Sequence, residues 1–381
     1  MLRLLICCLS LVCWVRSAAA EPPLVTLTCE TVWNVPAEDD DYLLGGLLVD
    51  AAWDLDGNLC VVDYANRDLK VFRADGRYLR TLGREGEGPG EVTDARLLVV
   101  HDDGRLGLLQ KFPAKLVWLE PDGDPGGQTV LENTLTSDGY LSMPHAVQHP
   151  GGLMGYVAVM SLTMNGPQED HWLVPVSPTG RVGEPLWHHE EIQPLRRDGE
   201  KFHEADLYYI WAARWAPDGR GGAWIATERD RYLISHRESD GAQLDYLTRP
   251  YEPVQRDDLA RHQVEAQLVR KRYDRRHLEL ADTDPVVHRL RLGDDGNLWV
   301  DLSLGGRGPE PGTIAQIDVW SPGGVWLAQR RLVGDYDPNL DQRLILDDHH
   351  VLVLGTDSDG EVRLRLLRIP DTPLLNKESD S

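Results

Sequence analysis

Several turns of this sequence are preceded, at matching distances, by polar or aromatic residues. The chain contains six similar repeats, each with a first turn between two short strands. Counting back from that turn places Val49, Arg96, Trp211, His288 and Asp341 at a similar depth along the first strand of their repeats. Arginine, histidine, tryptophan and aspartate around the mouth of a channel suit an anionic ligand or one that stacks on aromatic rings. The same residue types also make an ordinary polar lining of a water-filled channel. We predict that Arg96, Trp211, His288 and Asp341 bind a ligand.

A second candidate site is the basic cluster Arg270, Lys271 and Arg272. It lies in segment 250–285 of a chain with 39 basic and 62 acidic side chains and a formal net charge of −23. The cluster is either part of a solvated helix face paired with the acidic body, or part of a lid that contacts anions. The negative charge of the whole chain repels phosphate backbones, so we expect no nucleic-acid partner.

Signals for catalysis and metal binding are weak. The sequence contains no Gly-x-Ser-x-Gly turn, and we assign no catalytic residue. Beyond residue 20 the cysteines are Cys29 and Cys60, which lack zinc-site spacing. These two residues either form a disulfide in an oxidising compartment or pack as buried thiols. We expect no metal and no cofactor.

Turns flanked by short apolar strands recur six times and explain how such residues are positioned. The first turns are centred on Gly57, Gly104, Gly151, Gly219, Gly296 and Asp348. A unit of about 45 residues with four short strands has the size of a propeller blade. Since a blade cannot bury both of its faces alone, we expect the blades to stack around an axis and close into a ring.

The two ends of the chain complete this prediction. The last repeat supplies three strands, and residues 24–33 alternate like a strand that precedes the first repeat. We therefore predict an all-β fold, a six-bladed β-propeller in which the N-terminal strand closes the last blade. One helical insertion is expected between blades 4 and 5, in segment 250–285. Its helix would begin at Asp257 or Asp258, run to about Arg276 and bury Leu259, Ala266, Val269 and Tyr273.

Loop topology gathers the long connections on one face. In a propeller, the connection that leads into an inner strand lies at the same end as the connection between the second and third strands. Long segments of both kinds should therefore crowd one rim and form a binding face. They are 64–67, 133–145, 161–171, 190–208, 250–285 and 304–312.

Two short motifs in the first blade resemble those of known proteins. Asp63-Tyr64-Ala65-Asn66-Arg67, followed by an apolar strand, resembles the signature of NHL-type repeats. The run from Gly83 to Glu91 is similar to a segment common in secreted bacterial six-bladed propeller proteins. The resemblance implies a propeller fold, and its wider group includes binding scaffolds, lactonases and lyases.

The chain begins with the features of a secretory signal. Residues 1–20 hold Arg3, a short apolar core and the small residues Ala18-Ala19-Ala20. We expect a signal peptide at 1–20, a propeller at 21–370 and a disordered tail at 371–381. The predicted protein is secreted or periplasmic, monomeric and without a transmembrane segment. Its predicted function is non-enzymatic binding of a ligand or protein partner at the loop-rich face. The alternative is a lactonase-like hydrolase or lyase, which would need a metal ion such as calcium at the channel.

Overall fold

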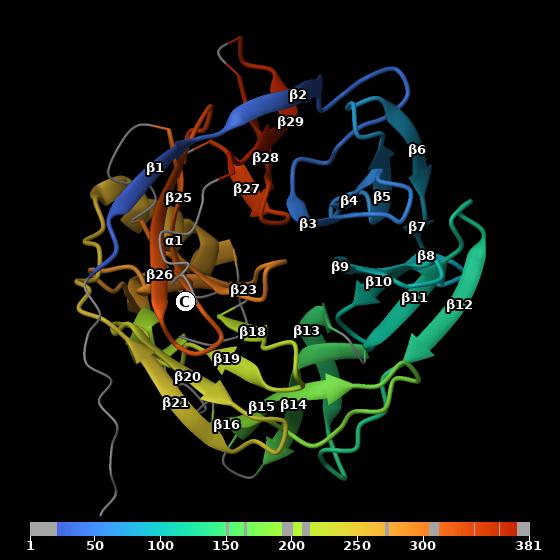
Figure 1. The fold of residues 1–381 in the computed structure, drawn as a ribbon. Helices are drawn as coiled ribbons and strands as arrows, with labels where there is room; N and C mark the ends of the chain where they lie inside the picture. Colours follow the sequence, from blue (N-terminus) through green and yellow to red (C-terminus); the bar gives the residue numbers. More distant parts are fainter. Residues whose placement is uncertain are drawn as a thin grey trace, which may run out of the picture.

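Six antiparallel sheets surround a central axis in the computed structural model of this chain (Figure 1). The structure describes residues 21–149, 152–163, 166–192, 201–207, 214–270, 274–304, 312–338, 340–357 and 359–371. The predicted signal peptide, nearly all of the predicted tail and parts of the long connections lie outside these ranges. Within them, the six sheets confirm the predicted six-bladed β-propeller.

Blades one to three are four-stranded. Blade one contains β3 (Leu48–Trp53), β4 (Leu59–Asp63), β5 (Asp68–Phe72) and β6 (Tyr78–Leu82). Blade two contains β9 (Ala95–Val100), β10 (Leu106–Gln110), β11 (Lys115–Leu119) and β12 (Pro125–Val130). Blade three contains β13 (Tyr140–His149), β14 (Gly152–Thr163), β15 (Gly166–Val176) and β16 (Trp187–Ile192). In each blade the first of these strands lies nearest the axis (Figure 1).

The other three blades follow the same plan. Blade four contains β18 (Trp215–Pro217), β19 (Ala223–Ile225), β20 (Leu233–Arg237) and β21 (Gln243–Thr248). Blade five contains β23 (Val287–Leu292), β24 (Leu298–Leu302), β25 (Thr313–Trp320) and β26 (Trp326–Val333), with β1 (Leu24–Thr28) as a fifth strand. Blade six contains β27 (Gln342–Ile345), β28 (His350–Thr356), β29 (Val362–Arg368) and β2 (Glu30–Pro36).

Short elements connect the blades. The parallel pairs are β7 (Arg84–Glu85) with β8 (Glu91–Val92), and β17 (Phe202–His203) with β22 (Leu278–Glu279). The helical elements are η1 (Glu204–Leu207), α1 (Asp258–Arg270) and η2 (Arg275–His277).

Aspartate-capped turns join the first two strands of several blades. In blade one, the Asp54 carboxylate accepts hydrogen bonds from the N–H groups of Asp56 and Asn58, at 3.0 and 2.7 Å. Gly57 follows with a φ of +76°, a conformation that other residues rarely adopt. In blade four, Asp218 makes the same contacts to Arg220 and Gly222, at 2.7 and 2.9 Å. The repeated turn chemistry therefore sets the repeated hairpin.

The hydrophobic core is divided among the interfaces between blades. Each of six buried clusters contains side chains from two neighbouring blades, as where Trp33 and Leu366 of blade six meet Phe72 of blade one. Sheets with two apolar faces have to be covered on both sides, so the core continues around the ring. Cys29 and Cys60 lie in different clusters and are free, buried thiols.

The N-terminal segment closes the ring in two places. As predicted, β2 is the outer strand of blade six, where it pairs with β29. However, residues 24–33 are not one strand, because β1 pairs in parallel with β26 of blade five. The chain passes from one blade to the next at Cys29, whose N–H donates to the Val333 carbonyl at 2.7 Å. The N-terminal segment therefore covers the edges of two blades.

The insertion after blade four contains α1, capped by the Asp257 carboxylate, which accepts a 2.8 Å hydrogen bond from the Ala260 N–H. The helix ends at Arg270 rather than near Arg276. The predicted apolar stripe is wrong, since Ala260 and Leu268 are buried, whereas Leu259 and Val269 are exposed. Within the described ranges, no helix has the length and apolarity needed to span a bilayer.

Contacts between connections support the predicted common face. Asp63, at the end of β4, accepts a 2.7 Å hydrogen bond from the N–H of Gly45, in the connection leading to β3. Asp63 also bonds Asn66, between β4 and β5. On the other side of the ring, Arg256 of the insertion forms an ion pair with Glu204, which precedes blade four.

Candidate functional site

The inner strands of four blades are irregular at the same level. An extra residue interrupts the pairing at Val49 in β3, at Arg96 in β9 and at His288 in β23, and β13 is irregular between Ser142 and His145. Bulges of this kind redirect the neighbouring side chains and are frequent next to binding sites.

One position after these irregularities, and at the same level in the other two blades, six residues form a ring around the central axis. In five blades this residue lies three positions before the last residue of the inner strand; in blade three it follows the irregular stretch of β13. We call this set the channel ring. Its members are Asp50, Leu97, His145, Arg214, Arg289 and Gln342.

Most ring side chains contact the inner strand of the following blade. Asp50 accepts from the Leu98 N–H at 2.8 Å, and Arg214 Nε donates to the Val287 carbonyl at 2.9 Å. Gln342 accepts from the Leu48 N–H at 3.0 Å. The His145 ring packs edge-on against Trp215, with ring centroids 5.4 Å apart. Four members of the ring therefore join neighbouring blades, while Leu97 is buried in the core between blades two and three.

Arg289 is the exception in this ring. Its guanidinium has no hydrogen-bond or ion-pair partner anywhere in the described part of the chain, although it interacts electrostatically with Asp50 and Asp301. Loss of solvent lowers its pKa from the usual value, and the two carboxylates oppose that shift. An arginine keeps its charge in proteins, so Arg289 is a cation held inside the molecule without direct neutralisation.

Two neutral histidines lie near this cation. Burial, together with the charge of Arg289, lowers the pKa of His145 to about 3. His145 Nδ1 is buried without a hydrogen-bond partner. Burial also lowers the pKa of His288 to about 4, although its side chain is accessible to solvent within the channel. At neutral pH both rings offer hydrogen-bonding nitrogens without charge.

The carboxyl group of Asp50 is the acidic member of the ring. Burial raises its pKa to about 6, while the Leu98 N–H, Arg289 and the Ala51 N–H oppose that rise. Behind His288, Asp301 and Arg343 form a bidentate ion pair with distances of 2.9 and 3.1 Å. That pair neutralises its own charges. Of the two arginines in the ring, Arg214 donates to the Val287 carbonyl, and Arg289 is the cation whose charge acts on Asp50.

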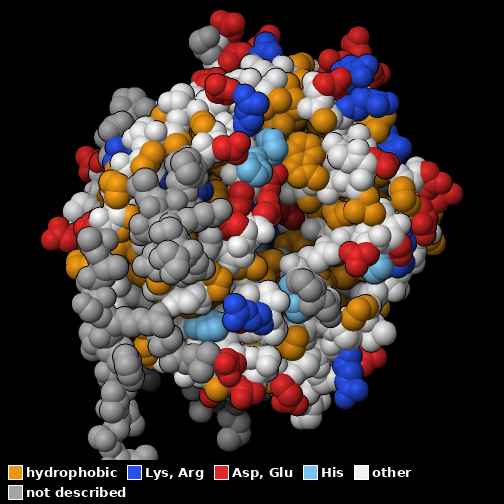
Figure 2. All heavy atoms as spheres, in the orientation of Figure 1, with side chains coloured by type: hydrophobic (Ala, Val, Ile, Leu, Met, Phe, Trp, Pro, Cys, Tyr) orange, Lys and Arg blue, Asp and Glu red, His pale blue; other side chains and the backbone are white. Residues whose placement is uncertain are grey.

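Space-filling views show that the axis opens at the surface. Figure 2 shows a hollow at the centre of one face, with acidic and histidine side chains at its rim. The central position agrees with the arrangement of β3, β9, β13, β18, β23 and β27 around the axis in Figure 1.

The predicted site residues have different surroundings. His288 lines the channel next to Arg289. Arg96 bonds Asp94 at 2.7 Å and the Tyr64 hydroxyl at 2.9 Å, with its guanidinium over the Tyr64 ring. Asp341 is buried and forms a 2.6 Å ion pair with Arg365. The structure does not gather these three residues into one cluster, and ligand binding by them stays a prediction.

The remaining predicted residues lie at the edge of what the structure describes. Trp211, Lys271 and Arg272 are outside the described residues, and Arg270 is the last residue of α1, described by its backbone alone. Nearby basic residues of the insertion are paired with acids. The pairs are Arg256 with Glu204 and Asp284, Arg261 with Asp282, Arg275 with Glu265, and Arg276 with Asp274.

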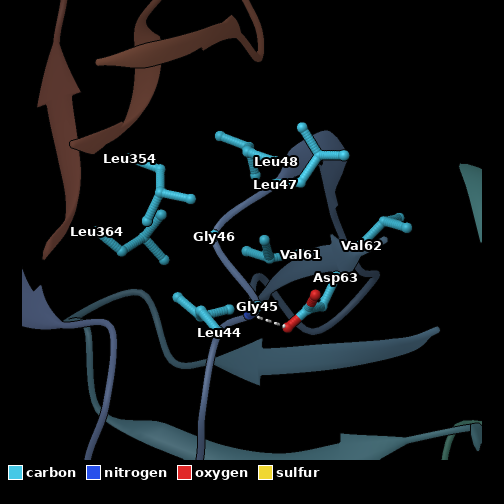
Figure 3. A pocket seen from close by; sticks show the side chains of 10 residues that line it. All are labelled: Leu44, Gly45, Gly46, Leu47, Leu48, Val61, Val62, Asp63, Leu354 and Leu364. Carbon is cyan, nitrogen blue, oxygen red and sulfur yellow. Dashed lines mark hydrogen bonds between the residues drawn. The ribbon is translucent and has the colours of Figure 1, made fainter. Parts of the chain in front are cut away.

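A small pocket between blades six and one is not a second candidate site. It lies among apolar side chains from both blades, and its one acidic group, Asp63, is turned to the Gly45 N–H (Figure 3). Its interior volume is about 10 Å³, room for roughly one water molecule. Its lining residues are Leu44, Gly45, Gly46, Leu47, Leu48, Val61, Val62, Asp63, Leu354 and Leu364.

The sequence comparison supports the propeller fold. A family model described as a 6-bladed beta-propeller matches residues 40–124, which cover blade one and most of blade two. No curated protein matches the chain in sequence. Among the described residues, no three His, Cys, Asp or Glu side chains form a group suited to a metal ion.

Solved structures align with the chain at low sequence identity. A protein of Bacteroides fragilis described as exported is 11% identical, with 92% of this chain and 100% of that chain covered and a TM-score of 0.47. A virginiamycin B lyase from Staphylococcus aureus is 10% identical, with 89% and 99% covered and a TM-score of 0.39. The calcium-binding protein regucalcin from Agrobacterium tumefaciens is 12% identical, with 93% and 99% covered and a TM-score of 0.42.

The family match and the arrangement of the sheets agree on the architecture. Six sheets follow each other around one axis, an inter-blade core runs through every interface, and β2 completes the last blade. The chain is a six-bladed β-propeller.

Proposed function

We propose that this protein is a binding propeller that holds a small anionic molecule in its central channel. The observation that supports this proposal is the unpaired guanidinium of Arg289. Elsewhere in the described structure, the buried arginines Arg343 and Arg365 make ion pairs with Asp301 and Asp341. A carboxylate or phosphate group on a ligand would give Arg289 the partner that it lacks among the described residues.

The surroundings of Arg289 favour binding over repulsion of an anion. His145 and His288 are neutral at physiological pH and can direct hydrogen bonds at a ligand. Arg289 itself is half-buried, and a charge pair formed where water is partly excluded is stronger than one at the surface. We assign the protein a non-enzymatic role that needs neither metal nor cofactor.

The proposal includes export. The charged start, short apolar core and small residues of segment 1–20 support secretion or delivery to the periplasm. N-terminal sequencing of the protein recovered from the medium or periplasm tests this, and an intact N-terminus on a protein confined to the cytoplasm would contradict it.

Isothermal titration with acetate and inorganic phosphate at low ionic strength tests the binding function. We expect measurable binding, and at least a tenfold loss in Arg289→Gln, which keeps polarity but removes the charge. Arg220→Gln, at an exposed turn, is the matched control and should bind as the unmodified protein does. Equal binding by Arg289→Gln, or no binding by any protein, would reject the proposal.

Metal analysis and activity assays on the same protein samples test the alternative function as a hydrolase or lyase. Metal analysis of protein purified without chelator or histidine tag is expected to find no tightly bound ion. A stoichiometric calcium or zinc ion, together with turnover of lactones, would favour a metal-dependent enzyme instead. Arg270→Gln, Lys271→Gln and Arg272→Gln test whether the basic cluster contributes to anion binding.

A further inference from the structure

Asp50 and Arg289 are opposite charges at equivalent positions of blades one and five. Their strands, β3 and β23, both lie next to the central axis (Figure 1), and the charge of each residue acts on the pKa of the other. Their charged atoms lie more than 4.0 Å apart, so the two side chains form no ion pair. Asp50 accepts backbone hydrogen bonds at Leu98 and Ala51, and no side chain of the described residues pairs with it.

Three acid–arginine pairs elsewhere in the described residues are in direct contact, unlike Asp50 and Arg289. Asp301 with Arg343, Asp341 with Arg365 and Asp318 with Arg249 are buried pairs with contacts of 2.6 to 2.9 Å. Removing two charges from water is costly unless each acquires a partner. Leaving Asp50 and Arg289 apart is therefore unfavourable, and a molecule that bridges them would relieve this cost.

We propose that the channel ligand is a small amino acid or ω-amino acid, whose carboxylate binds Arg289 and whose ammonium group binds Asp50. This inference rests on the proposed function, because it names the class of anion that Arg289 holds. An ammonium group is a donor without acceptor capacity and complements the carboxylate of Asp50.

The test compares amino acids with the acids that lack the amine. Glycine, β-alanine and 4-aminobutyrate are titrated into the full-length mature protein beside acetate, propionate and butyrate. The three chain lengths cover different separations of the two charges. We expect at least one amino acid to bind ten or more times as tightly as its matched acid.

Variants then assign the two ends of the ligand. In Asp50→Asn, which keeps an acceptor oxygen for the Leu98 N–H, the preference for the amino acid should fall below about threefold, a difference of about 0.6 kcal/mol. Binding of the plain acid should change little. In Arg289→Gln both ligands should bind weakly. Propylamine should compete with the amino acid in the unmodified protein, a measurement that does not depend on folding of any variant.

The outcomes separate this inference from the proposed function. If acids bind as tightly as all three amino acids, the amino-acid inference is wrong while anion binding stands. If neither series binds, both are wrong. A preference for amino acids that persists in a folded Asp50→Asn protein would also overturn the role of Asp50.

Discussion

The carboxylate of Asp50 on the inner strand of blade one accepts a 2.8 Å hydrogen bond from the backbone N–H of Leu98 on the inner strand of blade two. Gln342 makes the equivalent contact from blade six to the N–H of Leu48, and Arg214 bonds the Val287 carbonyl from blade four. These ring positions on the inner strands thus link neighbouring blades. Substitutions there affect stability as well as binding, so conservative replacements are needed to separate the two.

The free energy of unfolding of Asp50→Asn should increase, relative to that of the unmodified protein, as the pH rises. The pKa of Asp50 is about 6 in the folded protein and roughly 3.9 in an unfolded chain. Between these values the folded state binds more protons, so the contribution of Asp50 to stability falls as pH increases. Asparagine does not titrate and is free of this penalty.

Urea unfolding at pH 4, 5, 6 and 7 measures this effect as the difference between variant and parent. Asp56→Asn, on the exposed turn of the same blade, is the control and should show a much flatter difference. A difference for Asp50→Asn that does not change across this range would contradict the raised pKa.

His145 should make the stability of the protein depend on pH in the opposite direction. Its folded pKa of about 3 lies below the roughly 6.5 of an unfolded histidine. The unfolded state therefore binds more protons below pH 6.5, and stability is lost as the pH falls from there toward 3. His145→Gln should lose less stability than its parent between pH 7.5 and pH 5.

Thermal unfolding at these two pH values checks the prediction for His145. His262→Gln, on the exposed side of α1, serves as the control. If His145→Gln and its parent lose equal stability on acidification, His145 does not stay neutral inside the folded channel. His288, with a folded pKa of about 4, should behave like His145 over a narrower range.

The blade architecture could be predicted because its signals are local. Alternating apolar residues and Asp-Gly turns specify each hairpin, and the three-stranded last repeat leaves one strand to be supplied by the N-terminus. The split of residues 24–33 at Cys29 could not be predicted. Two neighbouring edge strands, β26 and β29, offer equivalent backbone partners to the same alternating segment.

The register of the inner strands could not be predicted to the exact residue. Counting back from the turns gave Val49, Arg96 and His288, which are the extra residues of three bulges. The next residue in each strand belongs to the channel ring, so Asp50 and Arg289 were missed by one position. Nothing in the sequence marks such a bulge, and a shift of one residue changes the direction of a strand side chain. The buried side of α1 was also predicted wrongly. Nothing in the sequence of this charged helix distinguishes the buried Ala260 and Leu268 from its other apolar residues.

Gly76→Ala should destabilise the ring closure more than Gly57→Ala. Both glycines have positive φ values, +87° and +76°, so alanine is strained at either turn by about 1–2 kcal/mol. At Gly76 an added Cβ would also lie 2.8 Å from Cγ of Trp33 on the closing strand β2, whereas nothing lies within 4 Å of a Cβ at Gly57. Overpacking of this kind costs about 1–3 kcal/mol more.

Chemical unfolding of the two alanine variants measures this difference directly. Because the turns belong to the same blade and share the same backbone strain, Gly57→Ala isolates the steric contact with Trp33. Equal losses would show that Trp33 moves aside without weakening β2.

Arg249→Leu should be among the most damaging single substitutions outside the channel. Arg249 Nε lies 2.6 Å from Oδ2 of Asp318, which is fully buried in blade five. The guanidinium also packs over the rings of Tyr232, Tyr251 and Trp326, at 4.9, 4.9 and 4.8 Å. Leucine would leave the Asp318 carboxyl group buried without its charge partner, at a cost of about 3–5 kcal/mol.

The second substitution Asp318→Asn distinguishes lost charge pairing from lost packing. If the unpaired carboxylate causes the damage, Arg249→Leu with Asp318→Asn should recover much of the stability measured by urea unfolding. Arg77→Leu, which removes an exposed ion pair with Asp75, is the control and should cost less than about 1 kcal/mol. A double variant as unstable as Arg249→Leu alone would assign the loss to the three aromatic contacts. In that case the guanidinium joins the insertion to blades four and five mainly by packing.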